Sequence, residues 1–184
     1  MVVLLAGVCI GCVPRVRLPE PPPRDAPIAE RNQAYLDLAP VGRVDLVMTK
    51  NGGEIARWVQ HLELGNGLRV AHPADLLPAV LPGSPTAQQA ARFSDHRTRH
   101  SISVLVASSI VAVGLGVLTG YLFGRVDRAS VAPYVGFGML FVGGLSYAWT
   151  IVESALSNNA RGAAFGSFPR DLAERLGFSP PPLP

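Results

Sequence analysis

Two long stretches of the chain carry almost only apolar side chains. Residues 101–124 contain no ionisable side chain except Tyr121, and the only ionisable side chains of residues 132–152 are tyrosines. An α-helix needs ~20 apolar residues to cross the hydrocarbon core of a bilayer, and residues 101–124 and 132–151 both meet that length. The loop between them, residues 125–131, is too short to hold a domain. The pattern therefore predicts an integral membrane protein that crosses the bilayer twice as an antiparallel helical hairpin.

Aromatic side chains lie where the two membrane interfaces of this hairpin should be. Such belts are typical of membrane helices, because aromatic rings prefer the level of the lipid headgroups. The residues at the loop end are Tyr121, Phe123 and Tyr134, and those at the opposite end are Tyr147 and Trp149, with Phe93 nearby. Length and aromatic placement thus indicate the same depth for the two spans.

Ser84 and Pro85 indicate where the first long helix begins, with Ser as the N-cap and Pro in the first helical position. No helix-breaking residue follows before the first span, so we expect one continuous helix from Pro85 to Gly124. At 1.5 Å per residue it would be ~60 Å long, about twice the hydrocarbon thickness. Residues 84–100 would then form a juxtamembrane helix in water.

Residues 41–83 are predicted to form a small β-rich module. Val44, Leu46 and Met48 alternate with other side chains, and tight turns rich in Gly and Asn follow at residues 51–53 and 65–67. The pattern predicts a meander of three antiparallel strands, which resembles the opening of a small SH3-like barrel. A module of about 40 residues buries little surface, so we expect it to pack against the membrane, the C-terminal segment or a partner.

The middle segment of this module also fits a helix. Four apolar residues there recur at helical spacing, and Gly65 would be a good helix stop. They are Ile55, Trp58, Val59 and Leu62. The sequence thus leaves strand and helix open for this segment.

Both ends of the chain have their own patterns. Residues 1–13 match the apolar region of a secretion signal, and Ile10, Gly11 and Cys12 resemble the end of a bacterial lipoprotein signal, which makes Cys12 a lipidation candidate. Residues 14–40 begin with a Pro-rich stretch that predicts a disordered tether. Residues 152–184 are expected to hold an amphipathic helix, which repeats Phe168, Leu172 and Leu176 every four residues and ends at Gly177, before a Pro-rich tail.

Charge and cysteine content exclude several classes of protein. Charged residues make up 16% of the chain, against ~25% in ordinary soluble domains. The net charge is +3, but the arginines do not cluster into a nucleic-acid-binding face. Cys9 and Cys12 are spaced as in thiol–disulfide oxidoreductases but lack the strand and helix that such a site requires.

Few residues offer chemistry. His96 and His100 are spaced to share a helix face beside Asp95, but the sequence offers no third protein ligand nearby. We therefore expect these residues to be polar side chains at the level of the lipid headgroups and not a metal site. Glu153 should lie level with His100, near enough to the surface to be solvated. We predict no catalytic residues, no cofactor and no enzyme activity.

Small residues form a strip along the first span. Because lipid tails are as apolar as leucine, membrane helices associate where small side chains let their backbones approach closely. The strip consists of Ser108, Ala112, Gly116, Gly120 and Gly124, and the matching surface on the second span is Gly136, Gly144 and Ala148. We predict that the two surfaces pack together within one chain, with packing between copies as the alternative.

These features suggest a non-enzymatic anchor or scaffold of a bacterial inner membrane, with its module presented to an unknown protein partner or to another copy. The alternative is a small homo-oligomeric channel lined by the glycine-bearing helix. Arginines at the base of the hairpin, at positions 92, 97, 99 and 161, outnumber Arg125 and Arg128 in its loop, which favours a cytoplasmic base. A cleaved signal would place the base and the module in the periplasm, the orientation that we favour.

Overall fold

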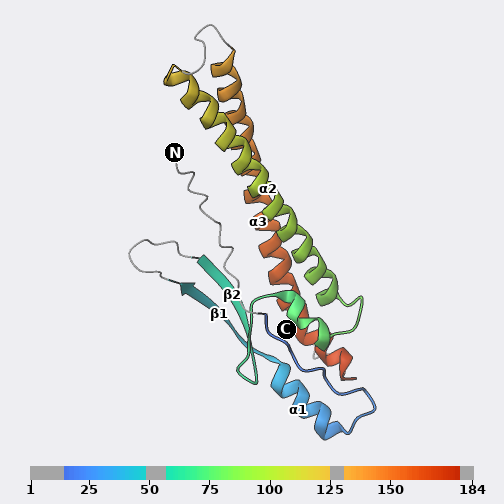
Figure 1. The fold of residues 1–184 in the computed structure, drawn as a ribbon. Coiled ribbons are helices and arrows are strands. Elements are labelled where there is room, and N and C mark those ends of the chain that lie inside the picture. The colour runs from blue at the N-terminus through green and yellow to red at the C-terminus, as the bar shows by residue number, and fades with distance from the viewer. Residues whose placement is uncertain (1–14, 49–56, 125–130, 179–184) are drawn as a thin grey trace. The chain divides into compact units, whose positions relative to one another are not determined.

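The structure is a computed structural model that describes residues 15–48, 57–124 and 131–178 (Figure 1). The chain divides into two compact units. Unit 1 comprises Met1–Ala87 and Phe165–Pro184, and unit 2 comprises Gln88–Ala164. Two long helices, α2 (Pro85–Leu122) and α3 (Ala132–Arg175), contribute residues to both units.

Helix α2 confirms the long continuous helix that the sequence predicts. It begins at Pro85, and the Ser84 hydroxyl accepts a hydrogen bond from the Ala87 amide at 3.3 Å, as an N-cap does. Gly124 follows its last turn with a φ of +66°, a conformation that glycine adopts without steric cost. The 38 residues between these signals contain no interior proline.

Helix α3 corrects the expectation of a separate amphipathic helix after the second span. It runs without a break for 44 residues, from Ala132 to Arg175. The only proline in its interior is Pro169, close to its end, so nothing in residues 152–164 forces the helix to stop. Gly177, with a φ of +76°, ends it where the sequence predicts.

The three-stranded meander is confirmed. Strands β1 (Pro40–Met48), β2 (Arg57–Leu64) and β3 (Arg69–Val70) pair antiparallel in the order β1-β2-β3, with Leu46 opposite Val59 and Leu62 opposite Val70. The helical alternative for this segment is therefore wrong. A 3₁₀ helix, η1 (Pro73–Ala79), follows β3, so the sheet of the described residues stays three-stranded. The first predicted turn, residues 51–53, lies outside the described residues.

The disordered tether expected over residues 14–40 is wrong for its described part. Residues 15–26 have no regular structure, yet Leu18 is only 3% exposed and the Val16 amide donates to an Asp75 carboxylate oxygen at 3.1 Å. Extended Pro-rich backbone has few internal hydrogen bonds to lose, so it can lie along a surface that buries its one leucine. Helix α1 (Ile28–Leu38) then occupies the rest of this stretch. Cys12 and residues 179–184 lie outside the described residues.

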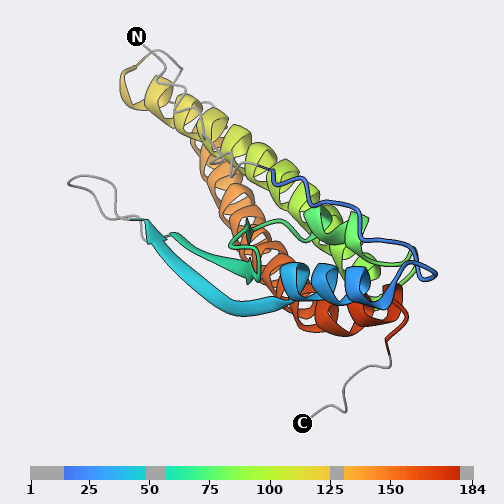
Figure 2. The same cartoon turned by 90° about the horizontal axis from the view of Figure 1, so that it is seen from below.

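The core of unit 1 joins the sheet to the end of α3, which is one of the three supports that the sequence left open for the module. Helix α1 lies beside that end of α3 (Figure 2). The Arg24 guanidinium donates to the Glu174 carbonyl in the last turn of α3, and the Arg31 guanidinium donates to the Leu176 carbonyl just after it, at 2.7 Å each. The buried apolar side chains are Leu18, Leu38, Leu62, Leu64, Val70, Leu76, Ala79, Val80, Phe165, Phe168, Leu172 and Leu176. The ~40-residue module thus gains its core from the far end of the chain.

Candidate functional site

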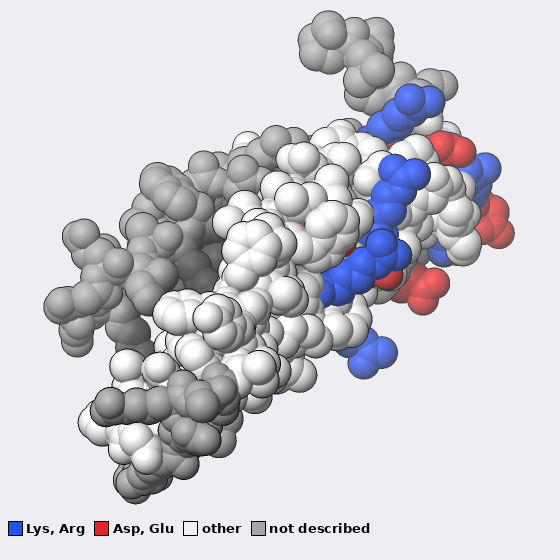
Figure 3. All heavy atoms as spheres, turned by 90° about the horizontal axis from the view of Figure 1, so that it is seen from above, with Lys and Arg blue, Asp and Glu red and all other residues white. Residues whose placement is uncertain are grey.

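Unit 2 is a pair of helices with apolar side chains on the outside. Both helices are long and apolar enough to cross a membrane, and only 11% and 17% of their most apolar windows are buried. Leu105 and Phe141 are each 69% exposed and Ile151 is 71% exposed. The core helix of a soluble protein would bury such residues. Figure 3 shows a long stretch of surface without Lys, Arg, Asp or Glu side chains.

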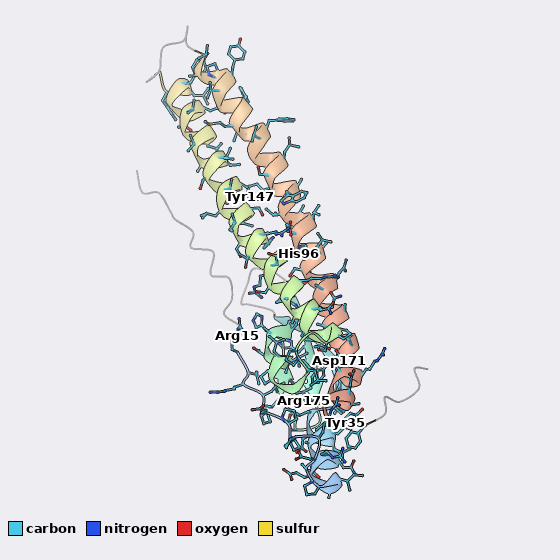
Figure 4. All side chains as sticks on the ribbon, turned by 90° about the vertical axis from the view of Figure 1, so that its right-hand side faces the viewer. Arg15, Tyr35, His96, Tyr147, Asp171 and Arg175 are labelled. Carbon is cyan, nitrogen blue, oxygen red and sulfur yellow. The ribbon has the colours of Figure 1, made fainter. Side chains whose placement is uncertain are left out.

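Polar side chains instead link α2 to α3 along the line where the two helices face each other, and two of them, Thr150 and Glu153, are buried. We call this line, formed by His96, His100 and Ser108 of α2 and Tyr147, Thr150 and Glu153 of α3, the polar seam. His96 and Tyr147 mark it in Figure 4. On α3 these residues recur every three positions, so together they cover about 120° of the helix surface.

The innermost contact of the polar seam is a short hydrogen bond between His96 and Glu153. The His96 Nδ1 atom lies 2.7 Å from Glu153 Oε2, and Glu153 is only 2% exposed. The sequence-based expectation placed this acid level with His100 and in water. It is wrong, because two helices packed closely at this level exclude solvent from the carboxylate, which takes an imidazole as its partner.

Two more hydrogen bonds continue the seam toward the loop end of the hairpin. His100 Nδ1 lies 3.0 Å from the Thr150 carbonyl oxygen, and since a carbonyl only accepts, this nitrogen carries the proton. The hydroxyls of Ser108 and Tyr147 lie 2.6 Å apart. Each bond joins one long helix to the other, so the seam fixes the register of the hairpin.

His96 and His100 share a helix face but do not contact the same group. Their Nδ1 atoms contact different groups of α3, and Asp95 is exposed and pairs with Arg99 at 2.8 Å. The described residues contain no group of three or more His, Cys, Asp or Glu side chains that could hold a metal ion. The histidines therefore act here as separate links between the helices.

Helix packing within the hairpin follows a different strip from the predicted one. A Cβ atom added to Gly114 would meet Met139 Cβ at 3.0 Å and the Gly136 carbonyl oxygen at 3.1 Å. A Cβ atom on Gly143 would meet Val111 Cγ2 at 2.5 Å. The close approach is therefore made by Gly114, Gly136 and Gly143.

Ser108 of the predicted strip and Gly136 of its predicted matching surface lie in the contact, while most other members do not. A Cβ atom on Gly116, Gly124 or Gly144 would meet nothing within 4 Å. Ala112 and Ala148 are exposed, and Gly120 is half-buried. The prediction that this strip packs within the chain is therefore wrong for most of its members.

Helix geometry explains the error. A residue every four positions advances by about 40° beyond a full turn, so a strict four-residue strip spirals away from a partner helix. The observed contact on α2 uses Ala107, Val111, Gly114 and Leu118, whose spacings of four, three and four stay on one side of the helix.

The fold and the seam define a class of structure, a long two-helix hairpin with an apolar exterior and a small α/β unit. No protein-family model matches the chain, and neither a curated protein nor a solved structure matches it. The polar seam forms hydrogen bonds between the two helices through side chains that can carry protons. It brings no serine or cysteine nucleophile to a histidine among the described contacts.

Removing one partner of the His96–Glu153 bond should cost more stability than removing both. We expect His96→Phe to destabilise the hairpin by about 1–3 kcal/mol, because Glu153 then stays buried without a hydrogen bond. The double variant His96→Phe/Glu153→Leu should regain most of this loss, since both polar groups are gone. Thermal unfolding in detergent measures both, with Asp95→Asn as an exposed control expected to change stability by less than about 0.5 kcal/mol. Equal losses in the single and double variants would contradict the pairing.

Proposed function

We propose that this protein is a non-enzymatic membrane anchor, in which unit 2 crosses a bilayer twice and unit 1 is the module presented to a partner protein. The observation that carries the proposal is the inverted distribution of side chains in the hairpin. Its large apolar residues face outward, whereas Glu153, 2% exposed, faces the partner helix.

This distribution suits lipid better than water. Exposed apolar patches larger than a few hundred Å² are rare on soluble monomers. In a bilayer the outward residues gain lipid contacts, and helices associate through small residues and interhelical hydrogen bonds instead of hydrophobicity. Gly114, Gly136 and Gly143 provide the first kind of contact, and the polar seam provides the second.

Unit 1 supports the scaffold role because it is folded but leaves apolar side chains uncovered. Ile28 and Leu36 of α1 are 63% and 64% exposed, and Val41 of β1 is 74% exposed. Ile28 and Leu36 are eight positions apart and so share one side of α1. These residues offer a protein partner an apolar surface.

The alternative, a homo-oligomeric channel, is favoured by one observation. Gly116 and Gly144 face open space, which leaves a small-residue surface for another copy. Such a surface on both helices would let neighbouring hairpins pack closely.

Two experiments test the proposed function, extraction of membranes and measurement of the native mass of the protein. Membranes that contain the full chain should retain it after alkaline carbonate treatment, as spanning proteins are retained. Native mass spectrometry of the protein in mild detergent should then show one copy. Release by carbonate would contradict the membrane anchor, and a ring of several copies would favour the channel.

We further propose that the membrane is a bacterial inner membrane, with unit 1 in the periplasm and the loop at residues 125–131 in the cytoplasm. The support is the apolar, signal-like residues 1–13. We expect Ala129→Cys, in a chain whose Cys9 and Cys12 are replaced by serine, to resist an impermeant maleimide added to whole cells. It should react after the cells are opened. Labelling of intact cells would reverse the orientation and agree with the arginine distribution.

A further inference from the structure

The segment of residues 15–24, which we call the strap, lies extended along unit 1. Val16 packs against the core of unit 1, and Leu18 and Pro21 are buried. Arg17, between the first two, is exposed. Successive side chains of an extended chain point to opposite sides, so the strap has one side that faces the core and one that faces away from it. Its contact with unit 1 thus has the form of a bound extended peptide.

Two charged residues of unit 1 hold the strap on either side of its leucine. At its start, the Asp75 carboxylate of η1 accepts a hydrogen bond from the Val16 amide at 3.1 Å and lies 3.6 Å from an Arg15 guanidinium nitrogen. Farther along, a guanidinium nitrogen of Arg175, the last residue of α3, lies 3.7 Å from the Glu20 carboxylate. Asp75 is only 7% exposed, so the fold fixes its position. Along the strap, unit 1 therefore presents an anion, an apolar core and a cation in that order.

The strap takes no part in a helix or a sheet. Four of its ten residues are prolines, which have no amide hydrogen to donate. Both of its ion pairs include an exposed side chain, Arg15 in one and Glu20 in the other, and exposed pairs contribute little to stability. Departure of the strap would therefore break no helix or strand, and it would uncover the part of the core that holds Leu18.

We propose that unit 1 binds an extended, proline-rich segment of its partner protein at the surface that the strap covers, and that the strap occupies this surface until the partner displaces it. This inference rests on the proposed function, in which unit 1 is presented to a partner, and it names the chemistry that unit 1 recognises. The partner segment has a cation that pairs with Asp75, a leucine three positions later for the core, and an acid two positions after that for Arg175. Proline-rich segments are already extended before binding and so lose little conformational freedom.

The test uses the full chain in a nonionic detergent, with a fluorescent decapeptide of the sequence of residues 15–24 as the probe. Leu18→Ser in the chain should increase the affinity for the probe at least tenfold by fluorescence anisotropy, because the weakened strap competes less. Glu20→Arg places a cation opposite Arg175 and should increase the affinity about three- to fivefold. Arg17→Gln is the matched control, since this strap residue is exposed, and it should change the affinity by less than about twofold.

The same changes in the probe should act in the opposite direction. With the Leu18→Ser chain as the receptor, a probe that carries Leu18→Ser should bind at least tenfold more weakly, and a probe that carries Arg17→Gln should bind almost unchanged. Equal affinities of all three probes would mean nonspecific attachment and would overturn the site. Cross-linking of the strap to unit 1 of a second copy would instead assign the surface to exchange of straps between copies.

Hydrogen exchange shows whether unit 1 stays folded when the strap is weakened. The amides of α1 and β2 should keep their protection in the Leu18→Ser chain. If they lose it, the strap is needed for the core, and the Glu20→Arg chain, whose changed side chain is exposed, decides by its affinity for the probe. An affinity equal to that of the unchanged chain would then overturn the proposal.

The peptide site and the membrane anchor fail separately. A chain that stays in carbonate-treated membranes but binds no probe as the Leu18→Ser variant contradicts the site and leaves the anchor intact. A chain that carbonate releases but that binds the probe contradicts the anchor and leaves the site intact.

Discussion

Gly65→Ala should unfold most of unit 1 while the hairpin of unit 2 stays folded. The Gly65 amide donates to the Ala39 carbonyl at 3.0 Å, and the Asn66 amide donates to the Asp37 carbonyl at 2.9 Å. The turn between β2 and β3 therefore lies directly on the C-terminal end of α1. A Cβ atom at Gly65 would overlap the Leu36 carbonyl oxygen. The oxygen belongs to the backbone and the position of a Cβ atom is fixed by the backbone, so neither atom can move away by a side-chain rotation.

We expect Gly65→Ala to cost about 3 kcal/mol, at the upper end for an overpacked site. Hydrogen exchange followed by mass spectrometry should show the amides of α1 and β2 losing protection while those of α2 keep it. Gly42→Ala is the matched control, because a Cβ atom there would meet nothing within 4 Å. Full protection of β2 in the Gly65→Ala chain would contradict the contact between the turn and α1.

Gly114→Leu should have the second largest effect, on the hairpin. At this position the backbone of α2 lies against α3, and a Cβ atom would meet the Leu140 amide nitrogen at 3.3 Å in addition to Met139 and Gly136. A leucine would force the helices apart and weaken the hydrogen bonds of the polar seam. We expect a loss of about 2–3 kcal/mol and a fall in melting temperature in detergent of roughly 10 °C.

Gly116→Leu provides a control only two residues away on the same helix. Its added side chain would point into open space, and leucine favours a helix over glycine by about 1 kcal/mol, so stability should stay equal or rise. If Gly116→Leu instead breaks up a native oligomer, the outward glycines face another copy and the channel gains support. Equal losses from both substitutions would contradict the helix packing described above.

The local pattern of the sequence was sufficient for the start of α2, the end of α3 and the first strand. Ser84 and Pro85 predicted the start of α2, Gly177 predicted the end of α3, and alternating apolar residues predicted β1. These signals act over a few residues, through capping, positive φ or the two-residue period of a strand. They therefore need no knowledge of the rest of the fold.

Contacts between distant segments could not be predicted in this way. Leu18 is buried in a stretch whose proline content indicates a disordered tether, because a core formed by segments far along the chain covers it. The same holds for α1, since the amides of Gly65 and Asn66 donate to the carbonyls of Ala39 and Asp37 at its C-terminal end. A Pro-rich composition therefore predicts disorder only for a segment that has no surface of the fold to pack against.

The sequence alone determined the two apolar helices and the first strand of the meander, since each depends on hydrophobic periodicity and turn residues, whereas it left the middle segment of the meander open between strand and helix. Only the tertiary structure decided that Glu153 is buried against His96 and that Gly114 rather than Gly116 lies in the helix contact. The physical reason is rotation: a small shift in how two helices face each other exchanges buried and exposed positions, and sequence spacing leaves that rotation open until the side chains pack.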